Sequence, residues 1–425
     1  MNKQKIQNKR INESYLKINH PSGLTVLLYP MKGYSSSYAL FGTKYGSIDR
    51  VFKTDKDDDF VTVPDGIAHY LEHKLFESED GDAFTLYAST GASANAFTSF
   101  DRTAYLFSCT DNFERSLEIL LSFVQEPYFT KETVEKEQGI IGQEIRMYDD
   151  DPGWRVLFNC LGSLYHNHPI KTDIAGTVES IAKIDKDLLY RCYNTFYNLN
   201  NMVLAVAGNF DPEVALAIVE RTCKKSEPIT IERGHYEEPG EIVREKTSIN
   251  LEVSLPQFCI GYKLPPLAGL EMLKADAECE LLNDILVGES SPLYREFYDS
   301  GLISGGDIGS EIMNGNGYFA VLFEGESREP DKVCSMLKAE IDRLGKEGIS
   351  KEAFELAKKS LYGRTIRQFN NVEAVASNLM AAHFSDTDIY DRIEVVAAIT
   401  YEDIVNRLAS YDNTRSALSV VNPVE

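Results

Sequence analysis

Two histidines and a glutamate near the start of the chain have the spacing of a metal site. Residues 64–76 read Pro-Asp-Gly-Ile-Ala-His-Tyr-Leu-Glu-His-Lys-Leu-Phe, which places His69 and His73 four residues apart. On a helix this spacing stacks the two imidazoles on one face, where they can hold one zinc ion. Glu72 lies at the edge of the same face. A carboxylate there can take a proton from metal-activated water without being a ligand.

The element that must position these side chains is a short amphipathic helix. Ile67, Leu71 and Leu75 recur every four residues on the opposite face, so this helix has an apolar side to bury. Asp65 is expected to be its N-cap. The order His-x-x-Glu-His is the inverzincin signature. A five-residue match also occurs on helices whose histidines merely face water, so the motif by itself leaves both interpretations open.

A second helix is expected at about 130–148. It carries Glu137 and Glu144, which are seven residues or two turns apart and therefore lie nearly on one face. It also carries Gly139 and Gly142, each of which costs a helix interior about 1 kcal/mol relative to alanine. That cost predicts close packing of the two glycines against a neighbouring element. By themselves, two glutamates on a helix indicate only a solvated face.

A β-hairpin is predicted from the strands 91–98 and 103–108. The first strand is lined by small side chains, among them Ala94, Asn95 and Ala96. If this strand lies at a sheet edge, its small residues leave room for an extended peptide to add as a further strand. The alternative is a tightly packed inner strand, and the sequence leaves the two open.

Charge and cysteine usage exclude several classes of partner. The 425 residues carry a net charge of −23, which argues against nucleic acid or an anionic membrane as the main partner. The seven cysteines are scattered and form no Cys-x-x-Cys pair, as is typical of a reducing compartment without disulfides or a thiolate zinc site. The N-terminus lacks the apolar core of a secretory signal, and no apolar run reaches membrane-spanning length. We expect a cytoplasmic protein.

The chain reads as two homologous domains joined by a linker. Residues 226–248 contain Pro, Glu and Gly without apolar periodicity, which is typical of an interdomain segment. The sequence therefore predicts an N-terminal metal-binding domain over 1–225 and a C-terminal homologous domain over 249–425.

The second half resembles a copy of the first that has lost the metal ligands. Residues 349–352 resemble residues 129–132, and both stretches open a long helix. In that register Glu144 falls on Arg364, and no histidine lies between residues 235 and 383, where the second metal helix is expected. A constellation kept in only one copy favours a single metal site per chain.

Together these residues identify a family resemblance that covers nearly the whole chain. The chain resembles the pitrilysin/insulinase family of zinc peptidases, in the short branch that includes the mitochondrial processing peptidase subunits and the bacterial YmfH-type proteins. The most specific matches are Gly-Ile-Ala-His-Tyr-Leu-Glu-His-Lys-Leu-Phe at 66–76, Ala-Asn-Ala-Phe-Thr at 94–98 and Val-Glu-Lys-Glu-Gln-Gly-Ile-Ile-Gly-Gln-Glu at 134–144.

The resemblance implies a fold and the remaining site residues. The family fold is α+β, with two similar domains whose mostly antiparallel sheets carry helices on one face and which form half of a clamshell. The third zinc ligand of the family is a glutamate some seventy-odd residues beyond the second histidine, and Glu144 matches it. A supporting glutamate stands seven residues earlier, which is Glu137. In relatives the substrate peptide adds to the sheet edge where Asn95, Ala94 and Ala96 lie.

The implied function is that of a zinc endopeptidase of peptides or small unfolded proteins, with Glu72 as general base. Relatives that act alone also carry an Arg and a Tyr that grip the substrate. Tyr298 and Ser304 stand at those positions here, and Arg295 is nearby but out of register. We therefore expect a two-chain enzyme whose second subunit is homologous, an unlike partner being favoured over a homodimer. The alternative is a non-proteolytic component of a protein-modification assembly, of the type associated with elongation factor P modification.

Overall fold

The chain folds into two compact units that interleave along the sequence. The computed structural model describes residues 2–79, 81–303 and 308–424. The first unit comprises Met1–Ile145, Asp173–Gly234 and Ile366–Ile389. The second unit comprises Arg146–Thr172, His235–Thr365 and Tyr390–Glu425.

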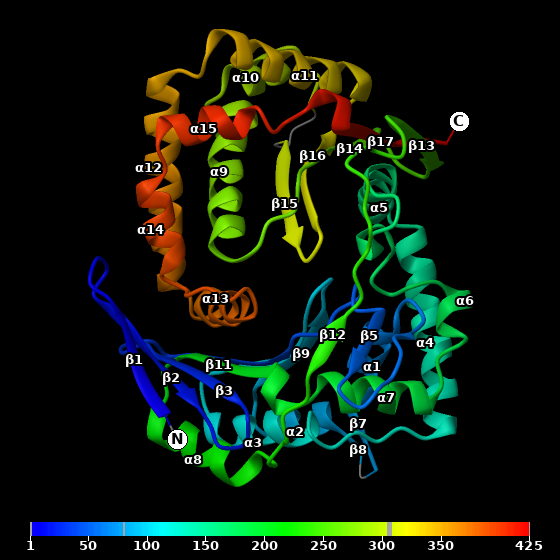
Figure 1. Cartoon of the computed structure of the whole chain (residues 1–425), viewed down its shortest axis with the longest axis vertical. Helices are drawn as coiled ribbons and strands as arrows, with labels where there is room; N and C mark the ends of the chain where they lie inside the picture. The colour runs from blue at the N-terminus through cyan, green and yellow to red at the C-terminus, as the bar shows by residue number, and fades with distance from the viewer. Residues whose placement is uncertain (1, 80, 304–307, 425) are drawn as a thin grey trace. The chain divides into compact units, whose positions relative to one another are not determined.

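The first unit is built on a seven-stranded sheet in the order β1-β2-β3-β11-β4-β10-β9 (Figure 1). Its strands are β1 (Asn2–Asn8), β2 (Glu13–Asn19), β3 (Thr25–Pro30), β4 (Ser37–Thr43), β9 (Ser93–Thr98), β10 (Thr103–Cys109) and β11 (Met202–Gly208). Among these, β3 and β11 run parallel and the other neighbours run antiparallel. The small sheets contain β5 (Val51–Thr54), β6 (Val61–Thr62), β7 (Glu77–Ser78), β8 (Gly81–Asp82) and β12 (Ile231–Arg233).

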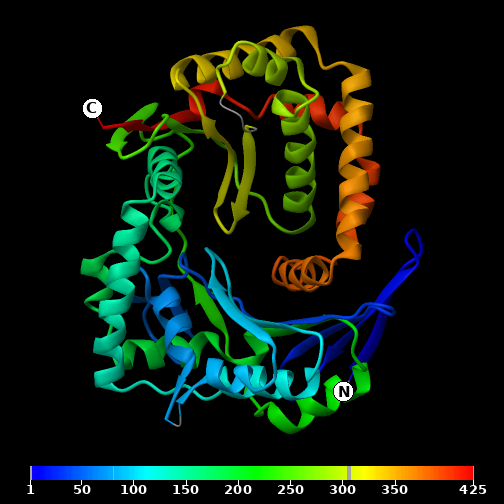
Figure 2. The ribbon, with the colours of Figure 1, turned by 180° about the vertical axis from the view of Figure 1, so that it is seen from behind.

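Helices cover both faces of this sheet. The helices of the first unit are α1 (Ile67–Leu75), α2 (Ala83–Ala88), α3 (Phe113–Phe123), α4 (Lys131–Asp149), α6 (Val178–Ile181), α7 (Lys186–Phe196), α8 (Pro212–Thr222) and α13 (Val372–Phe384), of which α1, α2, α3 and α13 contact the sheet. On one face Tyr105 of β10 packs against Phe123 of α3. On the other face α13 packs on β11 and β4 (Figure 2). A Cβ at Gly42 of β4 would lie 2.5 Å from the Met380 sulfur, so glycine lets α13 approach the sheet closely.

The second unit repeats this plan around a five-stranded sheet in the order β13-β17-β14-β16-β15. Its strands are β13 (Lys246–Leu251), β14 (Gln257–Lys263), β15 (Gly309–Gly315), β16 (Tyr318–Glu326) and β17 (Ser416–Pro423), with β13 and β17 parallel. Its helices are α5 (Pro152–Leu164), α9 (Gly269–Val287), α10 (Pro292–Asp299), α11 (Pro330–Glu347), α12 (Lys351–Arg367), α14 (Asp391–Ala398) and α15 (Tyr401–Leu408). Short 3-10 turns lie at Leu199–Asn201 and Gln368–Asn370 in the first unit, and at Pro169–Lys171 and Asn413–Arg415 in the second.

The order of elements shows the duplication that the sequence predicted. From β3 to β11 the first half runs through α1, α2, the β9–β10 hairpin, α3, α4, α5, α6 and α7, and the second half repeats this order from β13 to β17. The predicted α+β class with two similar domains is confirmed. Among the residues that the structure describes, no helix is both long and apolar enough to cross a membrane.

One helix of each half belongs to the other half's unit. Helix α5 packs on β17 and β14 of the second unit, and a Cβ at Gly261 would lie 2.7 Å from the Cys160 sulfur of α5. Helix α13 occupies the equivalent place on the first sheet. The compact units therefore differ from the predicted limits 1–225 and 249–425, which follow chain order. The segment 226–248, predicted as a linker, contains β12 and the start of β13.

Candidate metal centre

Helix α1 starts where a glycine allows a close backbone approach. Gly66 is its N-cap with φ 88°, and a Cβ at this position would lie 2.3 Å from the Ala175 carbonyl oxygen. Only glycine meets both demands without strain. The prediction that Asp65 caps the helix is wrong, because its carboxylate pairs with Arg50 Nε at 2.6 Å instead.

The apolar side of α1 is buried as predicted, and two polar groups tie α1 to the start of α4. Ile67, Leu71 and Leu75 are all buried. The hydroxyl of Tyr70 donates a hydrogen bond to the backbone carbonyl of Val134. One turn later the fully buried Lys74 donates to the Thr133 carbonyl at 3.4 Å and pairs with Glu77. These contacts hold the start of α4 beside α1. Glu137 and Glu144 follow further along α4.

Gly139 and Gly142 of α4 do not make the close packing contact that the sequence predicts. A Cβ added at Gly139 or at Gly142 would meet no atom of another element within 4 Å. The prediction of tight packing at these positions is therefore wrong. The contacts of α4 with α1 come from Thr133, Val134, Glu137 and Glu144 instead.

The side chains of α1 and α4 converge on one small volume. His69, Glu72 and His73 each offer one ligand atom, and these atoms lie within 4.8 Å of one another. From α4, Glu144 Oε1 lies 3.7 Å from His69 Nε2, and Oε2 lies 3.5 Å from His73 Nε2. The carboxylate therefore faces both Nε2 atoms at distances beyond an ordinary hydrogen bond.

Glu137 fixes the tautomer and orientation of one histidine. Its Oε1 lies 3.0 Å from His73 Nδ1, where the imidazole N–H donates to the carboxylate. The proton on Nδ1 leaves Nε2 free as a donor atom for a metal, and the carboxylate raises its basicity. His69 Nδ1 is buried with no hydrogen-bond partner among the described residues.

Burial sets the protonation of these groups. Desolvation lowers the pKa of His69 to about 3, which keeps this imidazole neutral near pH 7. Burial also disfavours charge on His73, but the hydrogen bond to Glu137 and the charges of Glu72 and Glu144 raise its pKa overall. The Glu72 carboxyl is buried and its pKa is raised to about 7 by desolvation. A carboxyl with such a pKa can both accept and return a proton near neutrality.

The donor set fits a catalytic zinc site. Two imidazole nitrogens and one carboxylate, from His69, His73 and Glu144, are a ligand set that zinc takes with its fourth position open. The Glu144 oxygens lie 3.7 Å and 3.5 Å from the two Nε2 atoms, and His69 is neutral near pH 7, as a metal ligand must be. Glu72 is close enough to reach the same space and accepts a hydrogen bond from Thr98 at 3.1 Å.

The residues predicted to contact a peptide lie on an edge strand. β9 ends the seven-stranded sheet, so among the described strands it has β10 alone as neighbour in that sheet. The edge alternative is confirmed and the inner-strand alternative is wrong. Asn95 is exposed and its Oδ1 accepts from the Ala96 N–H at 2.9 Å, while Ala94 and Ala96 point to the other face and are half-buried.

The positions expected to grip substrate lie in the second unit. Tyr298, on α10, is 63% exposed and stacks with Tyr294 at 6.4 Å between ring centroids. Arg295 lies on the same helix. Ser304 lies outside the described residues.

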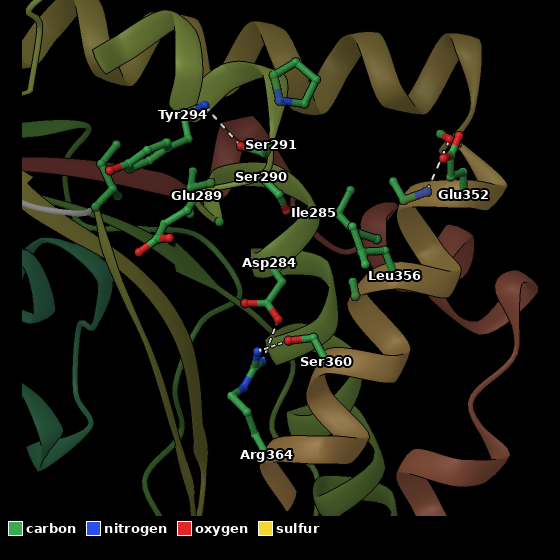
Figure 3. Close-up of a pocket in the computed structure, with 17 residues that line it drawn as sticks. Asp284, Ile285, Glu289, Ser290, Ser291, Tyr294, Glu352, Leu356, Ser360 and Arg364 are labelled. Atoms are coloured by element: carbon green, nitrogen blue, oxygen red, sulfur yellow. Dashed lines mark hydrogen bonds and ion pairs between the residues drawn. The ribbon is translucent and has the colours of Figure 1, made fainter. Parts of the chain in front are cut away.

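The second unit holds a cluster of polar side chains on α9 and α12 (Figure 3). In the order of elements these two helices correspond to α1 and α4. Arg364 of α12 points at two acids of α9, with Nη2 2.6 Å from Asp284 and 3.3 Å from Glu280. Its Nη1 donates to Ser360 at 2.8 Å. Asp284, Ser360 and Arg364 line a cavity of about 810 Å³. The sequence had matched Arg364 with Glu144, but the two acids were missed because α9 was not recognised as the counterpart of α1.

The hydrogen bond from Thr98 to Glu72 was not predicted from the sequence either. Thr98 shares the strand period with Ala94 and Ala96, so the alternation placed it on the same face. Its contact with Glu72 depends on where α1 crosses β9, which no local pattern encodes.

Comparison with known proteins shows which family the chain resembles in sequence and fold. The model of the insulinase family, peptidase family M16, matches residues 63–178, and that of the peptidase M16 inactive domain matches residues 183–361. YmfH of Bacillus subtilis, described as an uncharacterized zinc protease, is 43% identical over 410 residues, 94% of each chain. A putative M16-like peptidase from Alicyclobacillus acidocaldarius superposes with a TM-score of 0.92 at 34% identity, covering 100% of this chain and 98% of that one. A probable mitochondrial-processing peptidase subunit beta of Arabidopsis thaliana is 21% identical over 389 residues, 85% of this chain and 71% of the relative.

Proposed function

The chain belongs to the insulinase family, peptidase family M16, and on that premise we propose that it is a zinc-dependent endopeptidase of peptides or small unfolded proteins. The observation that carries this proposal is the convergence of α1 and α4. Glu144 faces both histidine Nε2 atoms, and a carboxylate oxygen of Glu72 lies within 4.8 Å of the ligand atoms of His69 and His73. A purely structural metal site does not need a carboxylate that can act as a base beside its ligands.

Three side chains would hold the metal. His69, His73 and Glu144 would supply two imidazole nitrogens and one carboxylate, and Glu137 keeps the His73 ring turned so that Nε2 faces Glu144. When bound, zinc acts as a Lewis acid that lowers the pKa of water and polarises a carbonyl oxygen.

Glu72 would carry the proton. It takes one proton from the attacking water and returns it to the nitrogen of the leaving amine, so the carboxyl must cycle through both protonation states. With a pKa of about 7, the protonated and the ionised forms of Glu72 are both populated at neutral pH. The site lies beside an open sheet edge, and a peptide that adds to β9 would be held in extended form by backbone hydrogen bonds near Asn95.

The chain would work with a second, homologous subunit. A tetrahedral oxyanion needs a donor in addition to the metal, and loss of one such donor typically costs on the order of 10²-fold in rate. Tyr298 stands where an arginine is expected in relatives that act alone, and a relative of this chain is named as a subunit of a processing peptidase. An unlike partner is the first candidate and a second copy of this chain is the alternative. The seven free cysteines support a cytoplasmic location.

Hydrolysis of a quenched peptide library tests the proposal. The zinc-loaded chain is assayed alone and with its candidate partner, with and without a chelator, and Glu72→Gln is the control for contaminating peptidases. We expect chelator-sensitive cleavage that rises when the partner is added. Full activity of the isolated chain, with no gain from the partner, would contradict the two-chain enzyme. No cleavage under any condition would favour a non-proteolytic component of a protein-modification assembly, which the altered Tyr298 position also fits.

A further inference from the structure

A hydrogen bond joins the edge strand to the carboxylate of Glu72. The hydroxyl of Thr98, the last residue of β9, lies 3.1 Å from Glu72 Oε2. Thr103, across the hairpin, donates its own hydroxyl proton to the Tyr45 carbonyl at 2.9 Å and lies 3.4 Å from the Thr98 oxygen. An ionised carboxylate can only accept, and Glu72 Oε2 lies closer to the Thr98 hydroxyl than the Thr103 oxygen does, so Thr98 donates its proton to Glu72.

The end of the hairpin is held rigidly. The N–H of Ser47 donates to the Ser99 carbonyl at 3.0 Å, and that of Ile48 donates to the Phe100 carbonyl at 3.0 Å. The backbone of Gly46 approaches so closely that a Cβ there would lie 2.4 Å from Phe100. The donor at Thr98 is therefore anchored by neighbours that do not belong to α1, which is what a support for a reactive side chain requires.

We propose that Thr98 is a positioning residue for Glu72. Its hydroxyl holds one oxygen of the carboxylate and so turns the other oxygen towards the space between His69, His73 and Glu144. A glutamate has several accessible rotamers, and one charge-assisted hydrogen bond from a fixed strand selects among them. The inference rests on the proposed role of Glu72 as the base. On this proposal β9 would have two tasks: it receives the peptide, and it orients the base Glu72.

A pair of near-isosteric variants isolates the hydroxyl. Thr98→Val keeps the β-branched shape and removes the donor, whereas Thr98→Ser keeps the donor. For Thr98→Val we expect kcat to fall by about 10- to 100-fold, the size typical of lost supporting bonds at metal sites, with KM within about twofold of the parent. Thr98→Ser is expected to recover most of kcat. Thr25→Val, the same exchange on β3 of the same sheet, serves as the matched control and should change neither parameter.

Two further measurements separate positioning from general structural support. Thr98→Val should bind zinc as the parent does, since the hydrogen bond that it removes goes to Glu72, which is not a proposed ligand. In a Glu72→Gln background Thr98→Val should cause no further loss of rate, because the base through which it acts is already gone. Equal kcat for the valine variant and the parent, or a full additional loss in the Glu72→Gln background, would overturn the proposal.

The contact can also be tested without activity. Thr98→Val and Glu72→Met delete the same hydrogen bond, so their effects on the unfolding temperature should be non-additive. Additive shifts would show that the bond does not form and would overturn the proposal by themselves. If instead the shifts are non-additive but no variant or parent hydrolyses any peptide, the proposed function fails while the contact stands.

Discussion

Two helix pairs hold the same place in the two halves of the chain but carry opposite kinds of chemistry. In α1 and α4, two histidines four residues apart face the carboxylate of Glu144. In α9 and α12, two acids four residues apart, Glu280 and Asp284, face the guanidinium of Arg364. The spacing is the same in both pairs because it follows from the turn of a helix, and only the side-chain types differ.

The difference shows which helix pair would need an added cation to balance its carboxylates. The α9 and α12 cluster supplies its own cation, and Arg392 adds a second one against Asp276 and Glu280. Its charges are therefore paired within the protein. In the α1 and α4 cluster the acids Glu72, Glu137 and Glu144 surround two imidazoles, and none of the described ion pairs at this site involves a lysine or an arginine. An added divalent cation would complete it, whereas the other cluster is already complete.

The largest expected effect is on metal content. Protein reloaded with zinc should hold about one equivalent per chain, all of it at α1 and α4. Changing both His69 and His73 to alanine should reduce this to near zero, measured by elemental analysis. Changing Glu280 and Asp284 to their amides is the matched control and should leave one equivalent. Two equivalents in the parent, or zinc that survives loss of both histidines, would break the comparison.

The next effect separates the base from the ligands. Glu72→Gln should retain zinc and lose hydrolysis by about 10²- to 10⁴-fold, the usual contribution of a general base. Glu144→Gln should instead weaken zinc binding by at least about 10-fold, measured by competition with a chromophoric chelator. Parent-like hydrolysis by the Glu72 variant would show that the base lies elsewhere.

A third prediction concerns the stability of the metal-free protein. The pKa of Glu72 is about 7 in the folded chain against 4.5 ordinarily, so the folded state binds the proton more tightly than the unfolded state. The stability from this group is fully present below pH 4.5 and is lost as pH rises through 7. His73, whose pKa is also raised, acts in the same direction.

Thermal or denaturant unfolding at a series of pH values checks this directly. Between pH 5 and 8 the metal-free parent should lose stability relative to Glu72→Gln by on the order of 3 kcal/mol. The glutamine mimics the protonated carboxyl at every pH, so its own curve should be flatter. Parallel curves for parent and variant would show that burial of Glu72 does not raise its pKa.

The smallest effect is expected at Arg364. Its side chain is 39% exposed, so removing the ion pairs in Arg364→Gln should cost only about 1 kcal/mol of unfolding free energy. Zinc content and kcat should be unchanged, in contrast to Glu144→Gln at the equivalent place. A loss of zinc or activity in the Arg364 variant would mean that the second cluster takes part in the chemistry.

Local sequence patterns were enough to predict the elements that carry the chemistry. The register of α1 follows from the apolar repeat of Ile67, Leu71 and Leu75, and the spacing of Glu137 and Glu144 follows from two turns of a helix. The hairpin of β9 and β10 follows from alternation and turn residues. Each is a local pattern, set by chain geometry over a few residues, and each can be read without knowing what packs against it.

The tertiary structure alone decided what those elements meet. Gly66 rather than Asp65 begins α1 because the Ala175 carbonyl, more than a hundred residues away, approaches there. The exchange of α5 and α13 between the units could not be read from periodicity, since an amphipathic helix does not specify which sheet it covers. For the same reason the bond from Thr98 to Glu72 was invisible in the sequence. Each residue obeys its own local pattern, and only the packing of α1 across β9 brings the two atoms to 3.1 Å.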